Sequence, residues 1–120
     1  MIRAKLSWDG RTFTLELEGH ANYARPGEDL VCAAVSTLAF AVDKYLDRLD
    51  KQGLLIEKQN TVMEKGRAKM TAVPEAQSRE KFEGAFELAG CFLSILEENY
   101  PENIKISAKG QERKIYDRQA

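Results

Sequence analysis

The chain has 120 residues, of which 43% are hydrophobic and 31% are charged, and its formal net charge is −1. These values predict a single soluble globular domain, and they lack the basic excess with which nucleic-acid-binding proteins attract phosphate, so no direct nucleic-acid binding is expected. No apolar run is long enough to span a bilayer and the first residues lack the apolar core of a secretory signal, which predicts a cytoplasmic protein that has no membrane partner.

The N-terminal residues alternate between apolar and polar side chains, as in half-buried strands. Two such strands are predicted, one from Ile2 to Trp8 and one from Thr12 to Glu18, followed by Gly19-His20. Asp9-Gly10 between them is a preferred pair for a tight hairpin turn, because both positions need positive φ. The apolar positions are Ile2, Ala4, Leu6, Trp8, Phe13, Leu15 and Leu17.

A helical period follows, from about Gly27 to Gln52. Pro26 and Gly27 help to define its start, and Gly53 ends it. Apolar residues recur at spacings of three and four, which predicts one buried face. They are Val31, Val35, Leu38, Val42, Tyr45 and Leu49.

The second half of the chain repeats this pattern of a hairpin and a helix. Strands are predicted at Leu54 to Met63 and Arg67 to Val73, around the turn Glu64-Lys65-Gly66. A helix is predicted from about Glu75 to Asn99. Its apolar face consists of Phe82, Phe86, Ala89, Leu93 and Leu96. A short last strand contains Ile104 and Ile106.

The order ββαββαβ predicts an α+β fold in which an antiparallel-rich sheet carries both helices on one face. We expect one domain at residues 1–110 and a polar tail at residues 111–120, which frays. Lys65, Arg67 and Lys69 in the second hairpin are diluted by neighbouring glutamates, which favours a solvated face over an RNA-binding patch.

Cys32 is the first candidate for chemistry. It falls in the first turn of the predicted helix and at the edge of the apolar face. The partial positive charge of a helix N-terminus stabilises a thiolate, and exposed first-turn amides can bind an oxyanion. The alternative is a small core residue, which free cysteine often is.

His20 is the only histidine of the chain and precedes Cys32 by twelve positions. The intervening loop is long enough to fold the imidazole back over the helix start, and a Cys–His pair is a known way to activate a thiol. A surface or structural histidine is the alternative. The two cysteines, without a CxxC pair or further histidines, make a poor zinc site, so no metal and no cofactor is expected.

Four further residues have open roles. Asp29 could orient His20 or complement the helix dipole, and the latter is favoured. Ser36, one turn after Cys32, could donate a hydrogen bond toward the site or bond back to a helix carbonyl. Cys91 lies among apolar residues of the second helix and is expected to fill the core. Phe40 falls away from the core stripe, which suggests a subunit contact, an apolar substrate groove or cover by a loop.

The stretch GHANYARPGEDLVCAAVS resembles the signature of the ribosomal-processing cysteine proteases of the Prp family. That signature is Gly-His-Ala, a variable loop with glycine, then Asp-(Ile/Leu)-Val-Cys-Ala and a serine four residues after the cysteine. The interval of twelve between His20 and Cys32 matches. The later stretch LEENYPENIKI supports the resemblance, which extends over nearly the whole chain.

The resemblance implies a cysteine endopeptidase with Cys32 as nucleophile, His20 as base, and Asp29 and Ser36 as supporting residues. It implies a homodimer that removes a short N-terminal extension from a large-subunit ribosomal protein, after paired phenylalanines. Phe40 would suit the groove for that apolar segment. The rival hypotheses are a non-enzymatic ribosome-associated binding module of the same fold and a redox-active thiol protein.

The loop from Ala21 to Glu28 buries little apolar area, so its closed form should be only marginally stable without ligand. Gly19, Ala21 and Gly27 are the expected loop and hinge residues, with Gly27 the likeliest hinge because glycine tolerates positive φ. The family resemblance implies that this loop is a mobile lid. Pro26 departs from the family pattern and should stiffen the loop.

Overall fold

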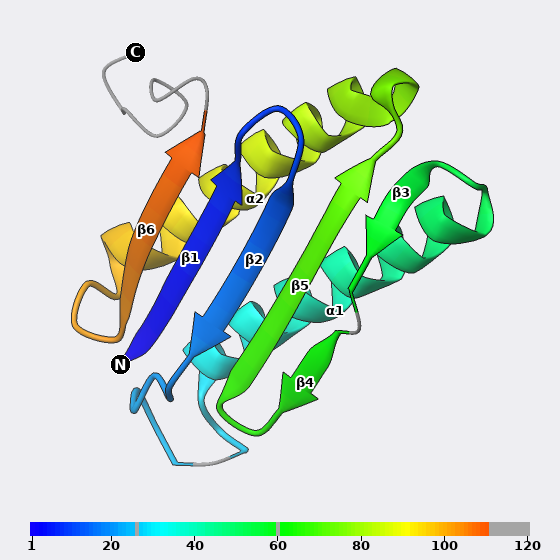
Figure 1. The fold of residues 1–120 in the computed structure, drawn as a ribbon. Helices are drawn as coiled ribbons and strands as arrows, with labels where there is room; N and C mark the ends of the chain where they lie inside the picture. The colour runs from blue at the N-terminus through cyan, green and yellow to red at the C-terminus, as the bar shows by residue number, and fades with distance from the viewer. Residues whose placement is uncertain (26, 60, 111–120) are drawn as a thin grey trace.

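The fold is an α+β arrangement with the predicted order of elements (Figure 1). The computed structural model describes residues 1–25, 27–59 and 61–110, so the expected effect of Pro26 and the expected tail at 111–120 lie outside the described residues. The second hairpin differs from the prediction in that its first strand is divided into two. The elements are β1 (Ile2–Trp8), β2 (Phe13–Glu18), α1 (Leu30–Lys51), β3 (Leu55–Lys58), β4 (Val62–Glu64), β5 (Arg67–Pro74), the short 3-10 helix η1 (Ala76–Ser78), α2 (Arg79–Asn99) and β6 (Ile104–Gly110).

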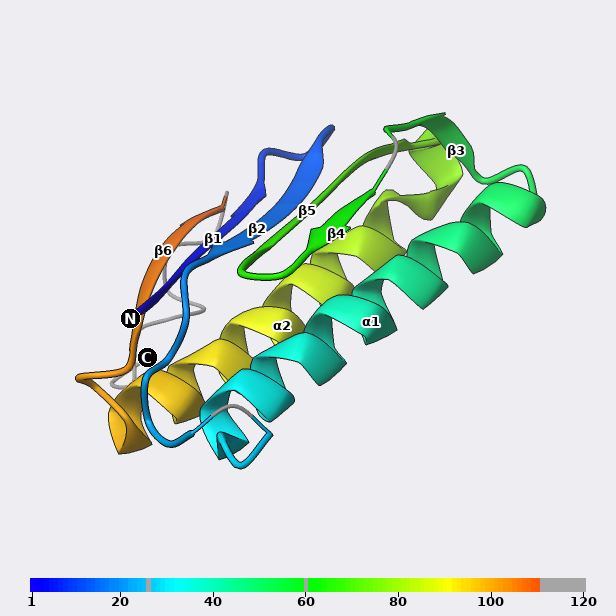
Figure 2. The same ribbon diagram turned by 90° about the horizontal axis from the view of Figure 1, so that it is seen from below.

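The strands form one sheet in the order β3-β5-β2-β1-β6, with β4 also paired to β5. All pairs are antiparallel except β1 with β6, which is parallel. Helix α1 connects β2 to β3 and α2 connects β5 to β6, and these two crossovers start from antiparallel strands and move in opposite directions across the sheet. Because such crossovers have one preferred hand, both helices fall on the same face, as Figure 2 shows.

The first hairpin has a longer turn than expected. Its last strand pair is Trp8 with Phe13, which leaves residues 9–12 in the connection. The Asp9 carboxylate accepts hydrogen bonds from the amides of Arg11, at 2.8 Å, and Thr12, at 2.7 Å. Asp9 therefore organises the turn through its side chain, and Gly10 supplies the positive φ of 90°.

The core lies between the sheet and the two helices. Every predicted apolar position of the first hairpin is buried, and so is every predicted stripe residue of α2. The Phe82 ring stacks on Trp8 with centroids 5.7 Å apart, and it meets Phe13 edge-on at 5.6 Å. These contacts attach α2 to the end of the sheet where the first hairpin turns.

Helix α1 begins at Leu30, three residues later than predicted, because Asp29 is its cap. It ends as predicted before Gly53, which has a φ of 73°. Its buried face is slightly rotated from the prediction and includes Ala39 and Leu46. Among the described residues, no helix is long and apolar enough to cross a membrane.

The expectation that Cys91 fills the core is wrong, because Cys91 is exposed. At 100° per residue it lies on the opposite side of α2 from Ala89 and Leu93, which face the sheet. Its apolar neighbours Leu88 and Ile95 share this outer face and are 73% and 58% exposed. The apolar neighbours of Cys91 therefore belong to a solvent-exposed face of α2 and not to the core.

Candidate active site

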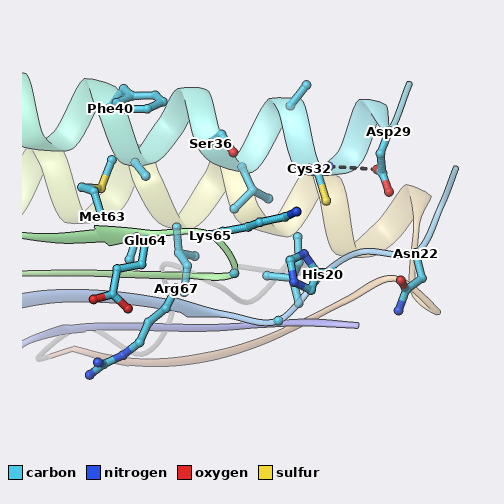
Figure 3. A pocket seen from close by; sticks show the side chains of 18 of the residues that line it. His20, Asn22, Asp29, Cys32, Ser36, Phe40, Met63, Glu64, Lys65 and Arg67 are labelled. Atoms are coloured by element: carbon cyan, nitrogen blue, oxygen red, sulfur yellow. Dashed lines mark hydrogen bonds between the residues drawn. The ribbon is translucent and has the colours of Figure 1, made fainter. Parts of the chain in front are cut away.

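A pocket of about 810 Å³ opens between the first turns of α1, the segment after β2 and the β4–β5 hairpin. Figure 3 shows the side chains of Cys32, His20 and Lys65 directed into the same space. Of the predicted site residues, Ala21 is buried behind the pocket and the others line it: Gly19, His20, Gly27, Asp29, Cys32, Ser36 and Phe40. The pocket thus brings together predicted site residues that the sequence separates by up to twenty-one positions, from Gly19 to Phe40.

Cys32 lies in the first turn of α1 and is half-buried. Its Sγ accepts a hydrogen bond from the backbone amide of Ala21, with a donor–acceptor distance of 3.4 Å. This contact joins the first turn of α1 to the segment that follows β2. Cys32 packs against the edge of the core and also lines the pocket, so its sulfur can reach a molecule there.

Asp29 caps α1 and holds the preceding loop. Its Oδ1 accepts from the amides of Val31 and Cys32, both at 3.0 Å, and its Oδ2 accepts from Tyr23 at 3.0 Å and Ala24 at 3.3 Å. Burial alone would raise the pKa of this carboxyl, but the four amides outweigh burial and hold the pKa below its ordinary value.

The capping role decides two expectations. Asp29 complements the helix start, as favoured, and its oxygens are directed at amides and not at His20. The expectation that first-turn amides bind an oxyanion is wrong for Val31 and Cys32, because Asp29 already occupies both donors.

The imidazole of His20 rests against the turn between β4 and β5. The amide of Gly19 donates to the carbonyl of Gly66 at 2.8 Å, which brings the two segments together. A Cβ on Gly66 would lie 2.9 Å from His20 Nε2. Only glycine leaves room for the ring there, and the φ of +79° at Gly66 also favours glycine.

The loop before α1 is attached at several points. A Cβ on Gly19 would collide with the Met1 carbonyl, so the backbone is fixed there. Ala21 is 1% exposed, and the Tyr23 ring meets Tyr100 edge-on at 5.1 Å. Gly27 has a φ of +86°, which favours glycine, and a Cβ there would meet no atom within 4 Å.

Ser36 and Phe40 follow Cys32 along α1 at intervals of four residues, so all three face the pocket (Figure 3). Ser36 is exposed, and it is Thr37 whose hydroxyl bonds back to a helix carbonyl, that of Ala33, at 2.8 Å. Phe40 is 63% exposed and forms part of an apolar wall. That wall consists of Leu17, Val35, Ala39, Phe40, Met63 and Ala68.

Sequence reasoning missed the β4–β5 hairpin as a wall of the site. Met63, Lys65 and Arg67 line the pocket, and the Lys65 side chain extends toward Cys32 (Figure 3). The turn at Gly66 is visible in the sequence, but its place beside His20 depends on the pairing of β2 with β5, which sets Glu18 opposite Arg67. No local signal reports that long-range register.

We predict that Gly66→Ala displaces the His20 ring. The ring resonances of His20, the only histidine, should shift in a proton–carbon NMR spectrum, because the new methyl group takes the space of the imidazole. Gly53→Ala is the matched control: its φ of +73° imposes a similar strain of about 1–2 kcal/mol, and no atom lies within 4 Å of its Cβ. Unchanged His20 resonances in Gly66→Ala would refute the steric argument.

A second prediction concerns the pH dependence of stability. Since the folded-state pKa of Asp29 is lowered, the carboxylate stabilises the fold above the unfolded-state pKa, and this contribution is lost as the pH falls through the folded-state pKa. Asp29→Ala should therefore lower the free energy of unfolding by about 1–2 kcal/mol near pH 7 and by much less near pH 2.5. Urea titrations measure this, with Asp29→Asn as a variant that keeps an acceptor but cannot ionise. A difference from the parent that stays constant with pH contradicts the prediction.

The chain is similar to known proteins over nearly its whole length. The family described as "Cysteine protease Prp" matches residues 1–105. The ribosomal processing cysteine protease Prp of Bacillus subtilis (strain 168) is 30% identical over 113 residues, which cover 89% of this chain and 96% of that protein.

Solved structures show the same fold. The ribosomal processing protease Prp from S. aureus, in complex with a covalently linked product peptide, gives a TM-score of 0.64 at 23% identity, and the match covers 91% of this chain and 100% of that one. SMU.848 from Streptococcus mutans gives a TM-score of 0.63 at 28% identity, with 92% and 96% covered. With the family match over residues 1–105, these similarities show that the chain belongs to the Prp family of ribosomal processing cysteine proteases.

Proposed function

We propose that this protein is a cysteine endopeptidase in which His20 activates Cys32 to remove the N-terminal extension of a large-subunit ribosomal protein. The observation that carries the proposal is the pocket into which both side chains open, one from the first turn of α1 and one from the segment after β2. Membership of a family of ribosomal processing proteases supports the substrate class. A protease acting during ribosome maturation works in the cytoplasm.

The reaction follows from the two groups. His20 takes the proton of the Cys32 thiol, and the thiolate attacks the scissile carbonyl to form a tetrahedral intermediate. The imidazolium then gives that proton to the leaving amine, which departs and leaves an acyl-enzyme. Water, deprotonated by His20, hydrolyses the thioester and restores the thiol. The Ala21 amide would steady the thiolate before attack.

The shape and chemistry of the pocket favour an extended apolar segment. The apolar wall combines residues of α1 with Leu17 of β2 and with Met63 and Ala68 of the β4–β5 hairpin. Phenylalanine side chains before the scissile bond would bury their rings against this wall, at a gain of about 25 cal/mol per Å² of apolar area. A structure of the S. aureus relative holds a substrate peptide, which supports a peptide as occupant.

The homodimer implied by the family resemblance is part of the proposal. On the described helices, four large apolar side chains are more than half exposed: Leu30 and Phe40 on α1, and Leu88 and Ile95 on the outer face of α2. A second copy that covers one of these faces would remove apolar area from water. Phe40 has two possible occupants, substrate and partner subunit, and the experiment below separates them.

We predict that Cys32→Ala loses peptide cleavage by about a thousand-fold or more, because the other thiol, Cys91, does not line the pocket and cannot form the thioester there. A peptide with paired phenylalanines, followed by mass spectrometry, measures the rate. Cys91→Ala, the matched control, should cleave at the parental rate because Cys91 is exposed on the outer face of α2.

Cleavage by Cys32→Ala at near the parental rate would exclude Cys32 as nucleophile. The same peptide tests the rival hypotheses in the parent protein. Binding without turnover would support the binding module, and peroxide-dependent sulfenate on Cys32 without cleavage would support the redox protein.

We also predict a dimer by light scattering at about 20–50 μM, a concentration at which an interface of ordinary size is populated. Leu88→Asp and Phe40→Asp each place a charge on one apolar face. If Phe40→Asp stays dimeric and loses peptide affinity, Phe40 belongs to the groove; if it becomes monomeric, Phe40 belongs to the interface. A parent protein that is monomeric throughout this range contradicts the dimer.

A further inference from the structure

A series of hydrogen bonds joins the Cys32 sulfur to the connection between α2 and β6. The amide of Ala21 donates to Sγ at 3.4 Å, and the side-chain Nδ2 of Asn103 donates to the Ala21 carbonyl at 2.9 Å. Asn103 is itself fixed through its backbone. Its amide donates to the Tyr100 carbonyl at 2.9 Å and its carbonyl accepts from the Ile2 amide at 2.8 Å.

The burial of Ala21 makes the hydrogen bond from Asn103 important. Ala21 is 1% exposed, so water does not replace a missing partner of its carbonyl, and a buried carbonyl without a partner is costly. Asn103 supplies that partner. Because the two peptide planes at Ala21 are linked through its Cα, fixing the carbonyl also limits where the amide points, and it points at Sγ.

We propose that Asn103 is a positioning residue for the Cys32 thiolate, which it supports by holding the Ala21 amide against the sulfur. This proposal rests on the proposed role of Cys32 as the nucleophile. Asn103 does not line the pocket, so it acts through Ala21 and not on the substrate. A residue 82 positions from Ala21 in the sequence thereby contributes to the reactivity of the thiol.

The charges around the sulfur do not depend on Asn103. The charged and titratable side chains that line the pocket with Cys32 come from three elements: His20 after β2, Asp29 at the start of α1, and Glu64, Lys65 and Arg67 in the β4–β5 hairpin. Asn103 is neutral, so its replacement removes none of these five charged or titratable side chains. A change in the pH dependence of the thiol then reports the lost hydrogen bond.

The loop retains other attachments when Asn103 is replaced. Asp29 holds the amides of Tyr23 and Ala24, and the Tyr23 ring contacts Tyr100. The variant should therefore keep its fold and the position of the loop, and lose only the orientation of the Ala21 peptide.

The test is the pH profile of iodoacetamide alkylation in the Cys91→Ser background, in which Cys32 is the one remaining thiol. Asn103→Ala should slow alkylation about five-fold near pH 7, because fewer molecules carry the thiolate, and should match the parent at high pH, where the thiol is fully ionised. Asn99→Ala is the matched control. It removes another side-chain amide that donates to a carbonyl, that of Ile95 at 2.8 Å, just before the same connection. Its profile should equal that of the parent.

Asn103→Leu serves as a second variant of similar shape that also lacks the donor, in case the smaller side chain unfolds the protein. A folded Asn103→Ala or Asn103→Leu with the parental profile overturns the proposal. In the parent, the Ala21 amide proton should shift downfield as Cys32 ionises, and an Ala21 amide that does not respond overturns it without any variant. Since alkylation uses no peptide, a failure of peptide cleavage and a failure of this proposal are seen separately.

Discussion

One carboxylate holds the site together. One carboxylate oxygen of Asp29 accepts hydrogen bonds from two amides in the first turn of α1. The other oxygen accepts hydrogen bonds from two amides in the preceding loop. The same group therefore starts the helix that carries Cys32 and folds back the loop that follows His20. Without this cap the helix end and the loop would each leave backbone donors to find other partners. The same four hydrogen bonds lower the pKa of Asp29.

The sheet supplies the other half of the geometry. Pairing of β2 with β5 places the β4–β5 turn beside the end of β2, where Gly66 leaves space for the His20 ring. The parallel pairing of β1 with β6 and the hydrogen bond from the Ile2 amide to the Asn103 carbonyl bring the end of α2 to the same end of the sheet, behind Ala21. The thiol and the imidazole thus rest on supports from different parts of the chain. This division suits the proposed pairing of Cys32 and His20 beside a pocket that would stay open to a peptide.

Sequence patterns anticipated the features that depend on local periodicity. The strand alternation up to Trp8 and the stripe from Phe82 to Leu96 give the buried faces directly, and the order of elements follows from them. Position at a helix start also pointed to Cys32. The wrong expectation for Cys91 came from residue type, since its position at 100° per residue places it opposite the core.

Other features depend on contacts that no local pattern reports. Two contacts join segments that are far apart in the chain: the His20 ring against Gly66, and the hydrogen bond from Asn103 to Ala21. Each contact forms only when the strands pair in their native register. The first-turn amides were expected to be open, but a capping side chain competes for the same donors, and Asp29 occupies them. Partner choice among nearby donors is a tertiary property, which explains why Asp29 was identified from the sequence while its four partners were not.

We propose that the fold makes Cys32 the reactive thiol, although Cys91 is the more exposed of the two. The most direct measurement is to treat the native protein with a peptide chloromethyl ketone that ends in phenylalanine, and to locate the adduct by mass spectrometry of the digested protein. We expect an adduct on Cys32 and an unmodified Cys91, with the preference lost in urea, where the pocket no longer exists. Modification of Cys91 before Cys32 in the native protein, or of both at equal rates, would contradict it.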